Sequence, residues 1–234
     1  MDSFSQAAGQ ALGLVAAADP KLVGIVALSL RVSLSAVVIG CAVGLPLGAL
    51  VAVNRFAGRR TLIVVLNALM GLPSVVVGLM VYLLLSRAGP LGAWGILFTP
   101  TAMVIAQAIL ITPTVAALSL QVTADAWAEY RDQLHSLGEN GLGAAATLLW
   151  DSRFSLVTIV LAGFGRAVSE VGAVMIVGGN IDGVTRVMTT TIALETSKGD
   201  LPLALGLGFI LLAIVLALNA GAYLVKETAQ RRYG

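Results

Sequence analysis

Four long runs of the sequence contain no charged residue, and each is long enough to cross a lipid bilayer. They cover 32–54, 61–86, 88–124 and 201–225, with lengths of 23, 26, 37 and 25 residues. A transmembrane helix needs about 20 mostly apolar residues in a row. Backbone amides cannot bond to water inside a bilayer, so such runs fold as helices or as a closed barrel. The runs lack the polar–apolar alternation of barrel strands, and they therefore predict an all-α membrane protein.

The composition agrees with a chain that lies mostly in the membrane. Of its 234 residues, 58% are hydrophobic and 11% are charged, and the mean hydropathy is +0.96. Soluble domains average about 25% charged residues. A single cysteine excludes an intrachain disulfide and a cysteine-cluster metal site. The net charge of +2 is too small to indicate nucleic-acid binding, so no nucleic-acid partner is expected.

We expect about five transmembrane helices. Hydrophobic stretches place them at 22–53, 61–86, 101–123, 154–178 and 201–225. The first stretch is longer than the bilayer is thick, so it must tilt or bend, and Pro46 is the expected bend. The fourth is the least apolar because it contains Arg166 and Glu170.

The Lys and Arg residues predict the orientation of the chain. Eight of them fall on one side of the five spans, four on the other, and two within spans. Because cytoplasmic loops are enriched in Lys and Arg, the N-terminus is expected outside and the C-terminus in the cytoplasm. The resulting organisation has an extracytoplasmic segment at 1–21, a transmembrane domain at 22–225 with a cytoplasmic segment at 125–153, and a cytoplasmic tail at 226–234. No basic residue precedes Lys21, so we expect no cleaved signal peptide.

The cytoplasmic segment has the pattern of a helix, a glycine-rich turn and a second helix. The first helix is expected over 125–137 and the second over 142–150. Gly138, Gly141 and Gly143 allow a sharp turn or a close approach of backbones between them. Such a shape fits a groove on a partner, and the alternative is a solvated connecting loop.

This segment resembles the cytoplasmic motif of permease subunits of binding-protein-dependent ABC importers. The motif reads Glu-Ala-Ala, three residues, Gly, nine residues, then Ile-x-Leu-Pro. With its glycine set on Gly138, the first triplet falls on 132–134 and the distal part on 148–151. The acidic start, the glycine and the aliphatic position match, whereas the Ala-Ala pair and the final Leu-Pro do not.

Further blocks extend the resemblance over about 60–225. Gly-Arg-Ala-Val-Ser-Glu-Val-Gly-Ala at 165–173 is similar to the stretch that follows the motif in molybdate- and tungstate-type permeases. The stretches 178–186, 189–192, 71–73 and 98–101 also fit, and the likeness is strongest to the tungstate type.

The resemblance implies a multi-pass subunit of the bacterial cytoplasmic (inner) membrane with the type I importer fold. It implies a homodimer around one path, a cytoplasmic ABC ATPase dimer and an extracytoplasmic binding protein that delivers the oxyanion. The expected function is import of an oxyanion, with tungstate as the leading candidate and molybdate or another anion as the alternative. The coupling segment that docks on the ATPase would comprise Asp132, Gln133, Leu134, His135, Ser136, Leu137, Gly138, Glu139 and Gly141.

Polar and helix-bending residues within the spans are candidates for the anion path or its gate. They are Pro73, Ser74, Gln107, Thr112, Arg166, Ser169 and Glu170. The spacing of Arg166 and Glu170 predicts that they share one helical face, where they could pair. Charges within a bilayer usually face a protein interior or a water-filled path. The alternatives are a structural pair between helices, snorkelling of Arg166, and ordinary interhelical hydrogen bonds for the uncharged residues.

Two more patterns bear on packing and on the outer face. Gly40, Gly44 and Gly48 permit close approach of another helix, within the subunit or between subunits. On the outer side, 185–196 is expected to form a short surface helix.

The chain has no Gly-x-x-x-x-Gly-Lys-Ser/Thr phosphate-binding loop. We therefore expect a transport subunit that is not itself an enzyme and holds no cofactor, with ATP and Mg bound by the partner ATPase. An ion-coupled secondary transporter is the second hypothesis, and Glu170 is its best support. It would normally show more spans or an inverted repeat. A membrane-embedded enzyme is a third class, but no paired metal ligands or activated nucleophile are evident.

Overall fold

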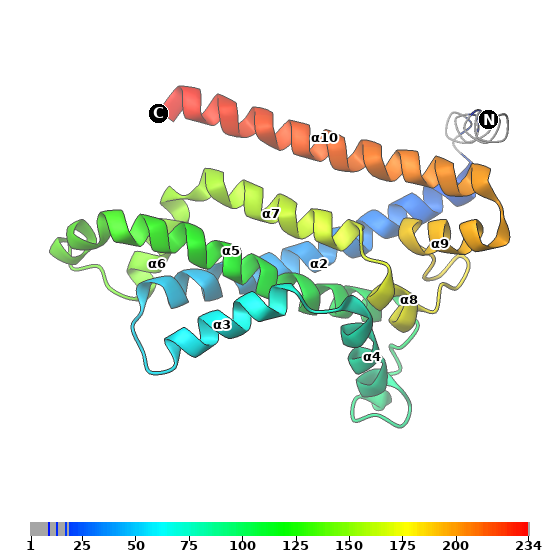
Figure 1. Ribbon diagram of the computed structural model, residues 1–234, viewed down its shortest axis with the longest axis horizontal. Coiled ribbons are helices and arrows are strands. Elements are labelled where there is room, and N and C mark those ends of the chain that lie inside the picture. Colours follow the sequence, from blue (N-terminus) through cyan, green and yellow to red (C-terminus); the bar gives the residue numbers. More distant parts are fainter. Residues whose placement is uncertain (1–8, 10–12, 14–16, 18, 234) are drawn as a thin grey trace. The chain divides into compact units, whose positions relative to one another are not determined.

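The computed structural model describes residues 9, 13, 17 and 19–233, so most of the predicted 1–21 segment and the last residue of the tail lie outside it (Figure 1). This part of the chain consists of helices and connecting loops, without a strand. The elements are α2 (Pro20–Val53), α3 (Arg59–Met70), α4 (Ser74–Leu85), the 3-10 turn η1 (Gly92–Trp94), α5 (Pro100–Ser136), α6 (Leu142–Asp151), α7 (Arg153–Val168), α8 (Gly172–Gly178), α9 (Met188–Lys198) and α10 (Leu201–Tyr233). The all-α prediction is thus confirmed.

Three helices are long and apolar enough to cross a membrane: α2, α5 and residues 201–221 of α10. Two more spans result if the broken pairs α3 with α4 and α6 with α7 each count as one. The expected number of about five is therefore the upper count among the described residues. The first and last predicted spans correspond closely to α2 and α10, and α2 continues as a helix through Pro46.

The predicted second span, 61–86, is two helices rather than one. α3 ends at Met70, and α4 begins at Ser74 after an extended residue, Pro73, with φ −64° and ψ 121°. Proline has no backbone N–H and disfavours a helical conformation in the residue before it, which accounts for the break.

The cytoplasmic helix expected at 125–137 is not a separate element. α5 begins at Pro100 and continues without a break to Ser136, 37 residues in all. Charges begin at Asp125, but no glycine or proline lies between 124 and 136 to end the helix. The predicted third span and the predicted cytoplasmic helix are therefore one helix.

The predicted fourth span, 154–178, is also interrupted. α7 ends at Val168 and α8 begins at Gly172. Before α7, α6 is bent from it by 84°, and these two helices are the pair with the length and composition of a broken span. By length and composition alone, α6 and α7 together qualify as one broken span or as a re-entrant loop, whereas the hydropathy pattern began the fourth span at 154.

The chain forms two compact units. The first contains the described residues up to 35 together with 73–107 and 167–218, and the second contains 36–72, 108–166 and 219–233. In the first unit α4 packs on α8, where a Cβ on Gly172 would stand 2.8 Å from Val75 Cγ2. The helix predicted at 185–196 is α9, which starts at Met188; its first turn, including Thr190 and Thr191, is buried, whereas its last three residues are exposed.

The second unit contains the expected coupling segment, residues 132–141, and is held together by close helix contacts. Cβ atoms on Gly40 and Gly44 would stand 2.9 Å from Ile111 Cγ2 and from the Thr112 carbonyl oxygen of α5, and one on Gly48 would overlap the Ala116 carbonyl. Glycine permits this approach because it has no Cβ. These three glycines therefore make a contact within the subunit, which decides between the alternatives left open above.

Candidate functional site

The turn between α5 and α6 has the geometry that its glycines predicted. Gly138 and Gly141 both adopt the positive φ that glycine tolerates, 79° and 53°. The amide of Gly138 donates to the His135 carbonyl at 3.1 Å, and that of Glu139 donates to the Leu134 carbonyl at 2.9 Å. These bonds satisfy the last carbonyls of α5 and reverse the chain into α6. The expected glycine turn and the second helix are confirmed, whereas the first helix is the C-terminal part of α5.

An apolar core anchors this turn to the end of α2. Leu134 and Leu148 are buried together with Ala49, Val53 and Ala144. Leu134 was expected to face a partner, but its 7% exposure places it in this core. It therefore supports the 132–141 segment by packing against the end of α2.

Three large apolar side chains around the turn face outward. Leu137 is 78% exposed, Leu142 76% and Trp150 73%. Beside them, a groove of about 210 Å³ between α5 and α6 is lined by Tyr130, Gln133, Leu134, Leu137, Thr147, Leu148 and Asp151. An exposed apolar cluster rimmed by polar residues is typical of a protein interaction site.

The sequence predicted the 132–141 turn, but it did not indicate that Leu142 and Trp150 are exposed members of this surface. Both lie in α6, which the sequence presents as a generally apolar stretch. The signal that could have indicated their exposure is the amphipathic pattern of 142–151, in which Ala144, Ala145 and Leu148 face the core.

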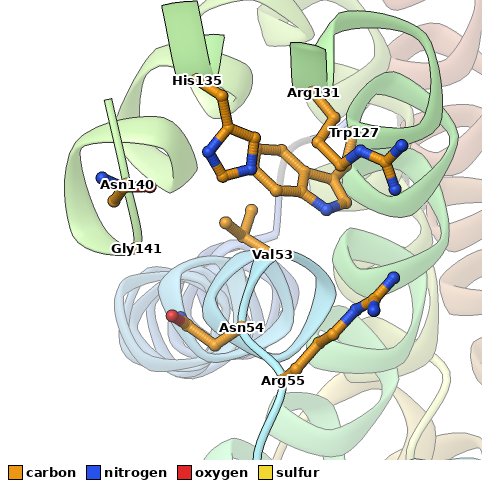
Figure 2. Close-up of a pocket in the computed structure, with 8 residues that line it drawn as sticks. All are labelled: Val53, Asn54, Arg55, Trp127, Arg131, His135, Asn140 and Gly141. Carbon is orange, nitrogen blue, oxygen red and sulfur yellow. The ribbon is translucent and has the colours of Figure 1, made fainter. Parts of the chain in front are cut away.

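A larger pocket, of about 420 Å³, lies on another side of the same turn. We call it the Arg55–Arg131 pocket. Its walls are the end of α2 (Val53, Asn54, Arg55), α5 (Trp127, Arg131, His135) and the turn (Asn140, Gly141). Figure 2 shows the rings of Trp127 and His135 side by side on one wall, with centroids 5.4 Å apart and planes tilted by 57°. His135 and Gly141 were expected in the coupling segment, whereas the other members were not singled out.

The polar candidates for the path are already engaged in hydrogen bonds. Gln107 is buried, and its amide nitrogen donates to the Ala167 carbonyl at 2.9 Å. The Thr112 hydroxyl donates to the Ala108 carbonyl, four residues earlier in α5, at 2.7 Å. A hydroxyl has one hydrogen to donate, so Thr112 has none left for an anion in this conformation.

Pro73, Ser74 and Ser169 all lie at helix ends. Pro73 precedes α4 and Ser74 is its first residue, while Ser169 is exposed and follows the last residue of α7. The Ser74 hydroxyl oxygen stands 3.0 Å from where a Cβ on Gly172 would lie, so this hydroxyl is packed against the start of α8.

Arg166 and Glu170 do not share a helical face, because α7 ends at Val168. Glu170 accepts a hydrogen bond at 3.0 Å from the amide of Ala173 in the first turn of α8, and its backbone carbonyl accepts one at 2.8 Å from the Thr189 hydroxyl. Carboxylates are common at this position because the first amides of a helix lack partners. Arg166 donates to the Leu72 carbonyl at 3.4 Å. The i, i+4 pairing geometry expected from the sequence is therefore wrong.

The described residues contain no group of three or more His, Cys, Asp or Glu side chains that could hold a metal ion.

Comparisons with known proteins identify relatives along nearly the whole chain. No protein-family model matches it. The tungstate uptake system permease protein of Peptoclostridium acidaminophilum is 42% identical over 227 residues, which cover 97% of this chain and 100% of the relative. A probable anion ABC transporter permease protein of Haloferax volcanii is 44% identical over 91% of this chain and 94% of its own length. A sulfate transport system permease protein of Synechocystis is 31% identical over 77% of this chain and 67% of the relative.

Two of these relatives are more than 40% identical to this chain along almost their full length. The described part of the chain also has three to five apolar helices of spanning length, as a membrane permease requires. The chain belongs to the family of ABC transporter permease proteins that includes the tungstate uptake permeases.

Proposed function

We propose that the chain is the membrane-spanning subunit of an importer that moves an oxyanion into the cytoplasm, with tungstate as the leading candidate substrate. The observation that carries this proposal is the 42% identity to a tungstate uptake permease over 97% of the chain. The sulfate permease relative is more distant at 31% identity, which favours tungstate over sulfate. As a member of this family with several helices of spanning length, the chain is a multi-pass protein of the cytoplasmic membrane.

The exposed surface at the α5–α6 turn is the proposed docking point for the ATPase. Leu137, Leu142 and Trp150 would enter an apolar cleft on the partner, and the charged side chains of 132–139 would form the rim of the interface. The buried Leu134 and Leu148 join this surface to the end of α2. A push on the turn would thus reach a transmembrane helix through packed side chains rather than through a flexible linker.

The assembly we propose contains two copies of this chain in the type I importer fold, with the N-terminus outside and the C-terminus cytoplasmic. A cytoplasmic ATPase dimer would bind ATP and Mg, and an outer binding protein would deliver the oxyanion. ATP-driven closure of the ATPase pair would move both coupling segments and switch the path from inward-open to outward-open. The carrier protein would then release its anion into the path.

In the path, we propose that the anion is held only transiently. Gln107 and Thr112 already donate to backbone carbonyls, so Gln107 has one amide hydrogen left for an anion and Thr112 has none in this conformation. A permanent cage of donors would slow release, because conduction needs binding weak enough to reverse. Arg166, Ser74, Ser169 and the helix breaks at Pro73 and Glu170 remain the proposed lining or gate residues.

The test is uptake by proteoliposomes that contain this chain, the ATPase and the binding protein. We expect ATP-dependent accumulation of labelled tungstate that requires all three components. Faster uptake of molybdate or sulfate would change the assigned substrate and leave the transport role intact. Uptake by this chain alone under an ion gradient would support the secondary transporter instead.

A further inference from the structure

The Arg55–Arg131 pocket has the composition of an anion site that the transport function does not use. Two guanidinium groups and an imidazole line it, and none of its eight lining residues is acidic. Arginine binds oxyanions well because its planar fork can donate two parallel hydrogen bonds to two oxygens.

Several donors in this pocket are free to bind a ligand. Among the described residues, the guanidinium of Arg55 and the side-chain amide of Asn140 make no hydrogen bond or ion pair within the chain. Asn54 differs, because its amide nitrogen donates to the Leu50 carbonyl at 2.9 Å. In the view of Figure 2 the guanidinium groups of Arg55 and Arg131 extend toward the same edge of the pocket.

One carboxylate competes with a ligand for these donors. Asp132 lies 3.2 Å from Arg131 Nε, and its side chain is 88% exposed. Ion pairs between exposed neighbours contribute little stability, so a doubly charged ligand can displace this carboxylate. Glu139 stands over Gly143 at the start of α6. The N-terminus of this helix therefore already faces a carboxylate, and it does not contribute to anion binding in the pocket.

The volume decides what kind of ligand fits. The pocket has a volume of about 420 Å³, many times the space that a single bound water needs. It is therefore too large for a dry ionic cage and suits a hydrated oxyanion, or a phosphate group that carries an organic part.

We propose that the Arg55–Arg131 pocket binds a tetrahedral oxyanion of the phosphate class. The bound anion bridges Arg55, just after α2, to Arg131 of α5. It thereby holds the coupling segment against the end of α2. The same chemistry is offered by a free inorganic anion and by the phosphate of an anionic lipid headgroup, and the experiment separates the two.

The first arm uses the full chain in nanodiscs of neutral lipid, titrated with inorganic phosphate and, separately, with tungstate. Trp127 lines the pocket, so its fluorescence in a Trp94→Phe, Trp150→Phe background reports binding there. We expect Arg55→Gln and Arg131→Gln each to weaken binding about tenfold or more, because a charge-assisted contact is lost. Arg60→Gln, an exposed arginine outside the pocket, is the matched control and should leave binding unchanged.

Asp132→Asn provides a gain that misfolding cannot imitate. Removal of the competing carboxylate should tighten binding severalfold, while Arg131→Lys, which keeps the charge and loses the fork, should bind with intermediate strength.

The second arm uses nanodiscs that contain phosphatidylglycerol, with retained lipid measured by native mass spectrometry. Retention that depends on Arg55 and Arg131, without a fluorescence response to phosphate, identifies the headgroup as the ligand. The proposal is overturned if neither arm shows binding, or if binding is the same in Arg55→Gln, Arg131→Gln and Arg60→Gln. A negative result in both arms leaves the proposed transport role standing, because that role is tested separately by ATP-dependent uptake.

Discussion

Gly78 of α4 lies against the backbone of Ala173 in α8, so close that a Cβ on Gly78 would stand 2.7 Å from the Ala173 Cα. Real Cβ atoms do not approach a backbone carbon to this distance, and neither helix offers a flexible side chain that could move aside. This contact joins two short helices that the hydropathy pattern placed in different spans.

The contact predicts that Gly78→Ala destabilises the protein although alanine is the better helix former. We expect a loss of about 1–3 kcal/mol from overpacking, against a gain of at most about 1 kcal/mol in helix propensity. Thermal unfolding of the purified protein in detergent measures the difference. Gly208→Ala is the control, because a Cβ there meets nothing within 4 Å. Equal losses at both positions would show that the α4–α8 contact is not tight.

Arg59 predicts a second stability effect, at the end of α2. Its Nε donates to the Val51 carbonyl at 2.7 Å and its Nη2 to the Ala52 carbonyl at 3.3 Å. Val51 and Ala52 are buried, and their carbonyls lie in the last turn of α2, where no later helical amide follows to bond them. Arg59→Met should therefore lower the unfolding free energy by about 1.5–3 kcal/mol, the value of hydrogen bonds to a charged group. Arg60→Met, at an exposed position beside it, should change it by less than about 0.5 kcal/mol.

A titration tests the electrostatics of the α5 C-terminal end. The negative charge of the adjacent Glu129, together with a side-chain hydrogen bond to it, raises the pKa of Tyr130. Repulsion disfavours the tyrosinate, so Glu129→Gln should lower the pKa of Tyr130 toward its ordinary value. Ultraviolet absorbance during an alkaline titration measures this change, and Tyr130→Phe identifies the component that belongs to this residue. A titration curve that stays the same in Glu129→Gln would contradict the assignment.

The elements that the sequence predicted well depend on local signals. The uncharged runs located α2 and α10, and the glycines at 138 and 141 marked a turn that does require positive φ. The end of α5 was misjudged because charge alone does not terminate a helix. The break at 169–171 contains no proline, and it is stabilised by the Glu170 carboxylate bonded to Ala173, a contact that hydropathy does not detect.

In the candidate sites too, local sequence signals predicted some features, whereas others depend on tertiary packing. Residues 132–141 could be assigned from their motif-like spacing, but which of them are exposed depends on packing against α2, and this packing buries Leu134. The Arg55–Arg131 pocket joins residues far apart in the chain. No periodicity within a single helix could have indicated it, because its walls meet only after α2, α5 and the turn have packed.

The turn between α5 and α6 provides the most specific functional prediction. Gly138 has φ 79° and open space around it, so a substitution there acts through backbone strain and not through collision. Gly138→Val should cost about 1–3 kcal/mol of local strain, displace the exposed Leu137, and reduce both ATPase association and ATP-dependent uptake. Gly138→Asn is the matched control, because asparagine tolerates the left-handed conformation and should retain most of both activities. Co-purification with the ATPase and uptake into proteoliposomes measure the two effects. If the valine variant bound and transported as well as the asparagine variant, the turn would have no part in coupling.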